Sequence, residues 1–303
     1  MTADTLATLS DQLILATILL YLAAMVGYAL ELAYATRPVQ VRELVASDGT
    51  TVTQETTATE PVAWAVRAGR YAVGLSWIGW AANLTATLTR GLAVERWPWG
   101  NMYEFVVAMI LAAVTVYLFM QLRYPVRFLG AFVSVIAAVG LGFSVRVLYT
   151  QAGPVVPALD SYWVAIHVTA AIAASGLFTV GGVAAVLYLV RREGPSRLPA
   201  LADLERVAHR VIVIGFPIWT FAVISGALWA DKAWGRYWNW DPKEVWAFIT
   251  WVAYAAYLHA RATAGWKGKA ALIVSLVAFG CLLFNLVGVN IFFGGLHSYA
   301  DVK

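Results

Sequence analysis

The chain has 303 residues, of which 61% are hydrophobic and 13% charged, and its formal net charge at pH 7 is +4. A soluble domain is closer to half apolar and a quarter charged, so this composition excludes an ordinary soluble fold and indicates a polytopic membrane protein. A small positive charge is typical of cytoplasmic loops and does not indicate nucleic-acid binding. The single cysteine, Cys281, excludes an internal disulfide and any motif built on paired cysteines.

Apolar runs of about 20 residues, the length needed to cross a bilayer as a helix, recur along the chain. They predict eight membrane helices in one all-α domain, residues 1–303, at roughly 13–35, 67–89, 103–121, 128–148, 163–190, 211–230, 245–260 and 271–293. The run at 245–260 is short and polar at both ends. The Thr-rich connection within residues 36–62 is expected to be a polar, solvated cytoplasmic loop.

The Lys and Arg residues are divided unequally between the two sets of loops. Fourteen of the 21 fall on one side and seven on the other, which assigns the richer side to the cytoplasm. Both termini are then extracytoplasmic. Three further outer segments accompany them: residues 90–104, which end at Glu104, residues 153–167, and the tryptophan-rich stretch described next.

Residues 229–251 read WADKAWGRYWNWDPKEVWAFITW and hold six of the fourteen tryptophans. Tryptophan prefers the boundary between apolar and wet surroundings, so an interfacial belt is the simplest interpretation. Belts are spread over several loops, however, whereas here four tryptophans fall within 13 residues: Trp234, Trp238, Trp240 and Trp246. We therefore predict an aromatic platform at the outer membrane surface that holds a planar ligand, haem.

The Asp-Pro-Lys-Glu sequence at 241–244 predicts a helix start. Asp241 is a suitable N-cap, proline fits the first helical position, and Glu244 can close a capping box. The positive end of that helix dipole would favour an anion such as a haem propionate. Three nearby cations are further candidates for that contact, although exposure to water or lipid headgroups explains each equally well: Lys232, Arg236 and Lys243.

Four histidines are candidate ligands. His167 lies near the outer end of its predicted helix, and His297 follows two glycines in the outer tail, where the backbone can approach other groups closely. Two neutral imidazoles can hold haem iron axially. His259 lies about 20 Å from Trp246 along its helix, so if it is a ligand it belongs to a second, inner site; a contact with a neighbouring helix explains it equally well. His209, beside a charged loop, is expected to be a bystander.

The sequence resembles a known family in WGRYWNWDPKEVWAFITW, in YLHAR and in GVNIFFGGLHSY. These motifs, with PWGNMYEF and VPALDSYWVAIHV before them, are similar to the WWD signature of CcsA/ResC proteins of System II cytochrome c biogenesis, a subunit called CcsB in actinobacteria. The System I haem proteins CcmC and CcmF share the tryptophan-rich core, but the continuation and the tail favour CcsA. The resemblance covers about Trp97 to Tyr299.

The resemblance implies a multi-pass protein of the bacterial cytoplasmic membrane that moves haem b outward and presents it to the CxxCH segment of apocytochrome c. It implies that His167 and His297 are the outer axial ligands and that His259 is the inner one. It also implies a CcsB/ResB-type partner subunit, which completes the inner site, and thioredoxin-like proteins that keep the substrate thiols reduced.

Catalysis in such a synthase is a matter of positioning, because the substrate thiols are themselves the nucleophiles. No residue of this chain is required as acid or base, although Asp241 and Glu104 are available. The competing interpretations are a non-catalytic haem exporter and a b-type haem electron carrier that use the same histidines.

Overall fold

A computed structural model describes residues 1–47, 50–155, 157–159, 161–191 and 196–297; for residues 37–59 it describes the backbone alone. Eight long helices follow one another: α1 (Ala3–Tyr34), α2 (Ala63–Ala93), α3 (Met102–Arg123), α4 (Gly130–Val147), α5 (Tyr162–Val190), α6 (Leu201–Trp234), α7 (Pro242–Thr263) and α8 (Gly268–Leu283). A π-helical turn η3 (Phe284–Gly288) and the short α9 (Val289–Phe292) continue α8, and two 3-10 turns, η1 (Arg127–Leu129) and η2 (Pro157–Leu159), lie in connections.

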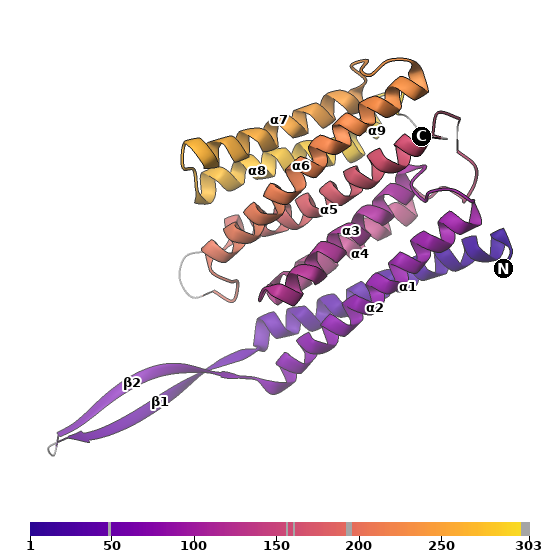
Figure 1. Cartoon of the computed structure of the whole chain (residues 1–303). Coiled ribbons are helices and arrows are strands. Elements are labelled where there is room, and N and C mark those ends of the chain that lie inside the picture. Colours follow the sequence, from indigo (N-terminus) through magenta and orange to yellow (C-terminus); the bar gives the residue numbers. More distant parts are fainter. Residues whose placement is uncertain (48–49, 156, 160, 192–195, 298–303) are drawn as a thin grey trace.

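The prediction of a helical, multi-pass membrane fold is confirmed. Six of the described helices are long and apolar enough to cross a membrane: α1, α3, α4 with η1, α5, α6, and α8 with its continuation. The polar ends of α7 and the less apolar composition of α2 keep these two below that threshold, but they lie side by side with the others (Figure 1). With an even number of passes, the start of α1 and the end of α9 lie at the same end, which we call the outer end.

The connection between α1 and α2 differs from the solvated loop that we predicted. It forms an antiparallel hairpin of β1 (Thr36–Ser47) and β2 (Thr50–Pro61), in which Thr36 pairs with Pro61. Figure 1 shows this hairpin projecting from the inner end, away from the helices. The physical reason is that the segment is rich in Thr and Val, whose branched side chains favour strands.

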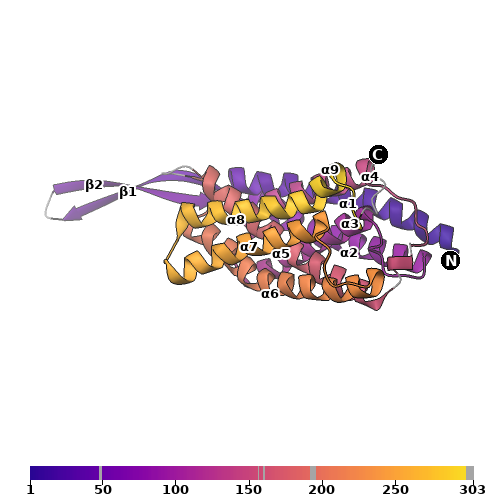
Figure 2. The same ribbon diagram turned by 90° about the horizontal axis from the view of Figure 1, so that it is seen from above.

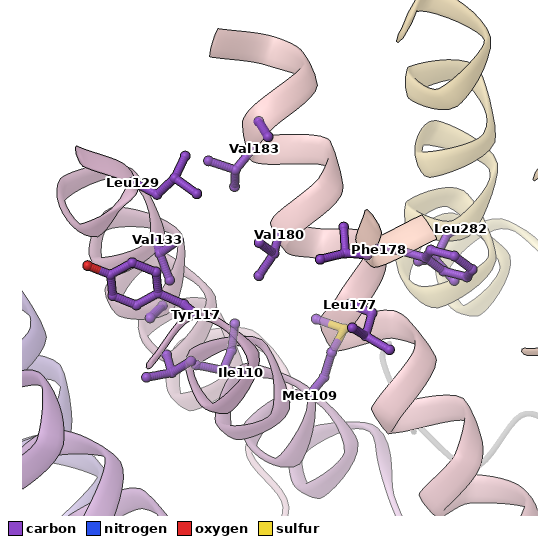
Figure 3. Packing of buried hydrophobic residues seen from close by; sticks show 14 of the residues in the cluster. Met109, Ile110, Tyr117, Leu129, Val133, Leu177, Phe178, Val180, Val183 and Leu282 are labelled. Atoms are coloured by element: carbon purple, nitrogen blue, oxygen red, sulfur yellow. The ribbon is translucent and has the colours of Figure 1, made fainter. Parts of the chain in front are cut away.

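The helices pack in chain order from α1 and α2 at one side of the bundle to α6, α7 and α8 at the other (Figures 1 and 2). α5 lies in the middle of the bundle, where it contacts α3, α6 and α8. In its most apolar 18-residue stretch, 89% of the residues are buried. Figure 3 shows the packing around it, where Met109 and Ile110 of α3, Val180 of α5 and Leu282 of α8 belong to one buried cluster. The bundle therefore holds α5, with His167 near its outer end, in a fixed position.

Side-chain caps define the helix starts at the outer end. Asn101 accepts a hydrogen bond from the Glu104 amide (2.9 Å) at the start of α3, and Ser161 accepts one from the Trp163 amide (3.3 Å) at the start of α5. Asp241 caps α7, and the capping box with Glu244 is complete, as predicted. These caps fix where the outer loops leave the membrane helices, and those loops surround the site.

Candidate functional site

An apolar cavity of about 180 Å³ opens at the outer end of the bundle, between α5, α6, α7 and the loop before α3. Its inner part is lined by residues such as Ala171, Trp219 and Ala247, and His167 and His297 both line it. The two histidines predicted to lie on the outer face are thus brought to one space, although 130 residues separate them in the chain.

His167 is held in one orientation by its neighbours on α6. Its Nδ1 lies 2.8 Å from the Ala222 carbonyl oxygen, and its ring stacks on Trp229 with centroids 6.0 Å apart and planes 12° apart. A Cβ added to Gly226 would lie 2.8 Å from the His167 ring, so only glycine allows the helix to pass this closely.

His297 is held by Asp241 and by two tryptophans. Its Nδ1 lies 2.8 Å from Asp241 Oδ1, while the Leu296 amide donates to Asp241 Oδ2 at 2.6 Å. Its ring meets the edges or faces of Trp229 (5.3 Å) and Trp234 (5.1 Å) at about 70°. A side chain on Gly295 would collide with the Asp241 carboxylate, which explains why the tail reaches the site through a glycine.

Asp241 has two roles, since it caps α7 and also orients His297. Burial by itself raises the pKa of this carboxyl, but the hydrogen bonds from His297, Leu296 and Lys243 outweigh burial and lower the pKa below its usual value. The group is therefore an ionised acceptor at neutral pH and not a poised acid.

The tautomers of the two rings follow from these partners. A carbonyl and a carboxylate only accept hydrogen bonds, so Nδ1 donates in both histidines, and in the neutral ring Nε2 keeps the lone pair. A second partner that fixes the ring and its tautomer is the usual support for a metal-ligating histidine. The donor set, two imidazoles at an apolar cavity, fits axial ligation of haem iron.

The rings of the predicted aromatic platform do not lie in one plane. Trp238 lines the cavity and Trp234 packs on His297, but Trp246 lies against Phe284 with ring centroids 4.3 Å apart. Trp240 is 72% exposed and has a left-handed backbone (φ 57°), rare for a bulky residue. Because a helix and a tight turn point successive rings in different directions, the ring planes cross instead of aligning.

The cation that lines the cavity is Lys243, whereas Arg236 is exposed and is not among the described lining residues. Trp229, Asn285 and Trp99 also line it and were missing from the predicted site. Trp229 belongs to the predicted stretch, so its aromatic density was a usable signal. Trp99 lies in the outer segment 90–104 and in the PWGNMYEF motif, which was also a usable signal, whereas no local pattern relates Asn285 to the histidines.

The other two histidines lie away from the cavity. His259 is exposed on α7, on the same face as the exposed Phe248 and Val252. His209 lies on α6 with its Nδ1 3.2 Å from the Tyr257 hydroxyl, the kind of neighbour contact expected of a bystander.

Glu104 is the centre of a buried charge network next to the cavity. Its side chain accepts from Arg90 Nε (2.8 Å), from Arg96 (2.8 and 3.1 Å) and from the Gly100 amide (2.8 Å), and only 2% of the residue is exposed. Every partner is a donor, so the carboxylate is held in place, and it in turn holds the loop that carries Trp99. Glu104 is therefore a structural residue in this fold.

Comparison with known proteins relates this arrangement to cytochrome c assembly. Residues 99–297 match the profile of the family described as "Cytochrome C assembly protein". The chain is 32% identical over 286 residues to the cytochrome c biogenesis protein CcsA of Synechococcus elongatus, covering 75% of this chain and 88% of that one. The chain belongs to the CcsA/ResC family. A role in cytochrome c maturation follows from this membership.

Two further matches extend the comparison. CcsA of Chlamydomonas reinhardtii is 35% identical over 225 residues, which are 69% of this chain but 64% of that protein. Among solved structures, the cytochrome c haem lyase CcmF superimposes on 95% of this chain with a TM-score of 0.63, at 19% identity and over 47% of its own length. The CcmF comparison supports the fold, while the assignment to CcsA/ResC rests on sequence.

Proposed function

We propose that the chain is the haem-handling subunit of a System II cytochrome c synthase in a bacterial cytoplasmic membrane. In this proposal residues 229–251 form the WWD haem-binding segment, and the outer cavity holds haem b between His167 and His297. The observation that carries the proposal is the convergence of these two rings, each with its Nδ1 already engaged, at one apolar cavity.

The reaction at this site joins haem to the two thiols of a CxxCH segment in apocytochrome c. In each thioether bond an S–H adds across a vinyl double bond, so the sulfur and the hydrogen both stay in the product and no net oxidation occurs. The chain's own contribution is to bind and orient the ligand and to exclude water with the Trp219, Ala171 and Ala247 wall. Asp241 holds His297 and transfers no proton.

His259 serves a different site in this proposal. It lies about 20 Å along α7 from Trp246, too far for one haem to reach both ends. Its exposed face on α7 offers a surface to the helix of a CcsB/ResB-type partner, which would supply the other ligand of the inner site. Haem would then pass from the inner to the outer site before it meets apocytochrome c, whose thiols thioredoxin-like proteins keep reduced.

The test has two arms. Purified His167→Ala and His297→Ala variants should lose the absorption bands of bis-histidine haem, and unchanged bands in both would contradict the outer site. Co-expression with the partner and an apocytochrome should then yield covalent cytochrome. Bound haem without any covalent product would favour the exporter or the b-type electron carrier instead.

A further inference from the structure

We propose that Lys243 is the carboxylate-binding residue of the outer cavity and gives it a preference for porphyrins with ionised propionates. The inference rests on the proposed function, since it concerns the ligand of the same cavity.

Lys243 is the second residue of α7, is half-buried and lines the cavity. The Nζ donates to the Asn285 carbonyl oxygen at 2.6 Å, and an ammonium group has three protons to donate. This single neutral acceptor does not balance the charge. A partly buried cation without an anionic partner in contact loses hydration that nothing replaces, and a carboxylate in the cavity would supply that partner.

The neighbouring carboxylates accept hydrogen bonds from other groups, although Glu244 also lines the cavity. Asp241 accepts from His297 Nδ1, from the Leu296 amide and from the Lys243 amide, while Glu244 Oε2 accepts from the Asn239 and Asp241 amides. Among the described residues Lys243 forms no ion pair within 4.0 Å. When protonated, Lys243 therefore offers a ligand a positive charge that these two carboxylates do not bind directly.

Asn285 is a second, independent indication of a ligand. It is 6% exposed, its Oδ1 has no hydrogen-bond partner among the described residues, and it lines the same cavity. Buried side-chain polar atoms nearly always have a partner, so a polar group is expected here. If the Asn285 side-chain amide is rotated by about 180°, its NH₂ group takes the place of Oδ1. In that orientation it can donate a hydrogen bond to a carboxylate beside Lys243.

The backbone is irregular where Asn285 lines the cavity. Asn285 belongs to the π-helical turn η3, which interrupts the hydrogen-bond pattern between α8 and α9. Such turns are frequent at functional sites because they redirect side chains and backbone carbonyls. Here the turn presents both the Asn285 backbone carbonyl, bound by Lys243, and the side-chain Oδ1, which has no partner among the described residues.

The test compares haem with haem dimethyl ester, in which both propionates are uncharged. Each is titrated into the purified full-length chain carrying His259→Ala, so that the outer site alone is measured. The chain with Lys243 should bind haem at least about tenfold more tightly than the ester, the effect of one charge-assisted hydrogen bond. Lys243→Met should bind the two ligands equally, and Lys243→Arg should restore the preference.

Arg236→Met is the matched control, because it removes an exposed cation of the same segment and should leave the preference unchanged. An undiminished preference in Lys243→Met would overturn the inference. Should Lys243→Met bind neither ligand, Lys243→Arg decides: a retained preference supports the role and a lost one contradicts it. His297→Ala should weaken haem and ester alike; if it does not, the proposed function fails whatever Lys243 does.

Discussion

The histidines near the two ends of α7 lie in opposite surroundings. At the outer end, His297 is packed between tryptophans and bonded to Asp241, and it shares a cavity with His167. At the inner end, His259 is exposed, and His209 on α6 has its Nδ1 3.2 Å from the Tyr257 hydroxyl. In the proposed function, one chain supplies both ligands of the outer site, whereas the inner site takes a second ligand from a partner subunit.

The largest effect should come from comparing the replacement of His297 with the replacement of His259, each in the chain purified without a partner. His297→Ala should weaken haem binding by more than about 100-fold, above the range seen when only a supporting group is lost, because it removes a ligand. His259→Ala should leave the affinity unchanged. Titration of haem by absorbance measures both, and a large loss in His259→Ala would show that the inner histidine acts without a partner.

Next in size is Asp241→Asn, which keeps a good N-cap for α7 but removes the charge that orients His297. Loss of such a supporting group typically weakens metal binding by about 10–100-fold. The same titration measures it. Because the cap remains, circular dichroism should report unchanged helix content; a variant with native affinity would mean that Asp241 does not orient the ligand.

Protonation of Asp241 gives the same comparison a pH dependence. Since the folded pKa is lowered, the stabilisation is complete above the unfolded value of about 3.9 and is lost as the pH falls through the folded pKa. The difference in Tm between the unsubstituted chain and Asp241→Asn should not shrink from pH 8 to about pH 4. A difference that already disappears near pH 6 would contradict this assignment.

A smaller effect is expected at Gly226, where any side chain meets the His167 ring. Gly226→Ala should displace the imidazole and weaken haem binding by about tenfold, since overpacking costs about 1–3 kcal/mol. Gly280→Ala is the matched control: a Cβ there meets no atom within 4 Å, and alanine is the better helix former. Equal affinities for the two variants would argue against a fixed His167.

The smallest effect should follow replacement of residues 38–59 by a short Gly-Ser linker. The Val62 amide donates to the Ala35 carbonyl at 2.8 Å, so α1 and α2 are already joined at the base of the hairpin. Haem affinity at the outer cavity should stay within about 0.5 kcal/mol, as expected for distant sites. A larger change would link the inner hairpin to the outer site.

The sequence alone determined the membrane class, the order of the helices, the capped start of α7 and the set of histidines from which the site is built. These features depend on local properties: apolar run length, the side chain at a helix start, and aromatic density. The hairpin could also have been predicted from its β-branched residues, had the polarity of residues 36–62 not suggested a loop.

Tertiary structure alone decided which residues face one another. Trp229 rather than Trp246 packs on both histidines, and Lys243 rather than Arg236 lines the cavity, because helix rotation and the turn before α7 set the direction of each side chain. Asn285 reaches the same wall from the end of α8. Such contacts join segments tens of residues apart, and only the packing of complete helices fixes them.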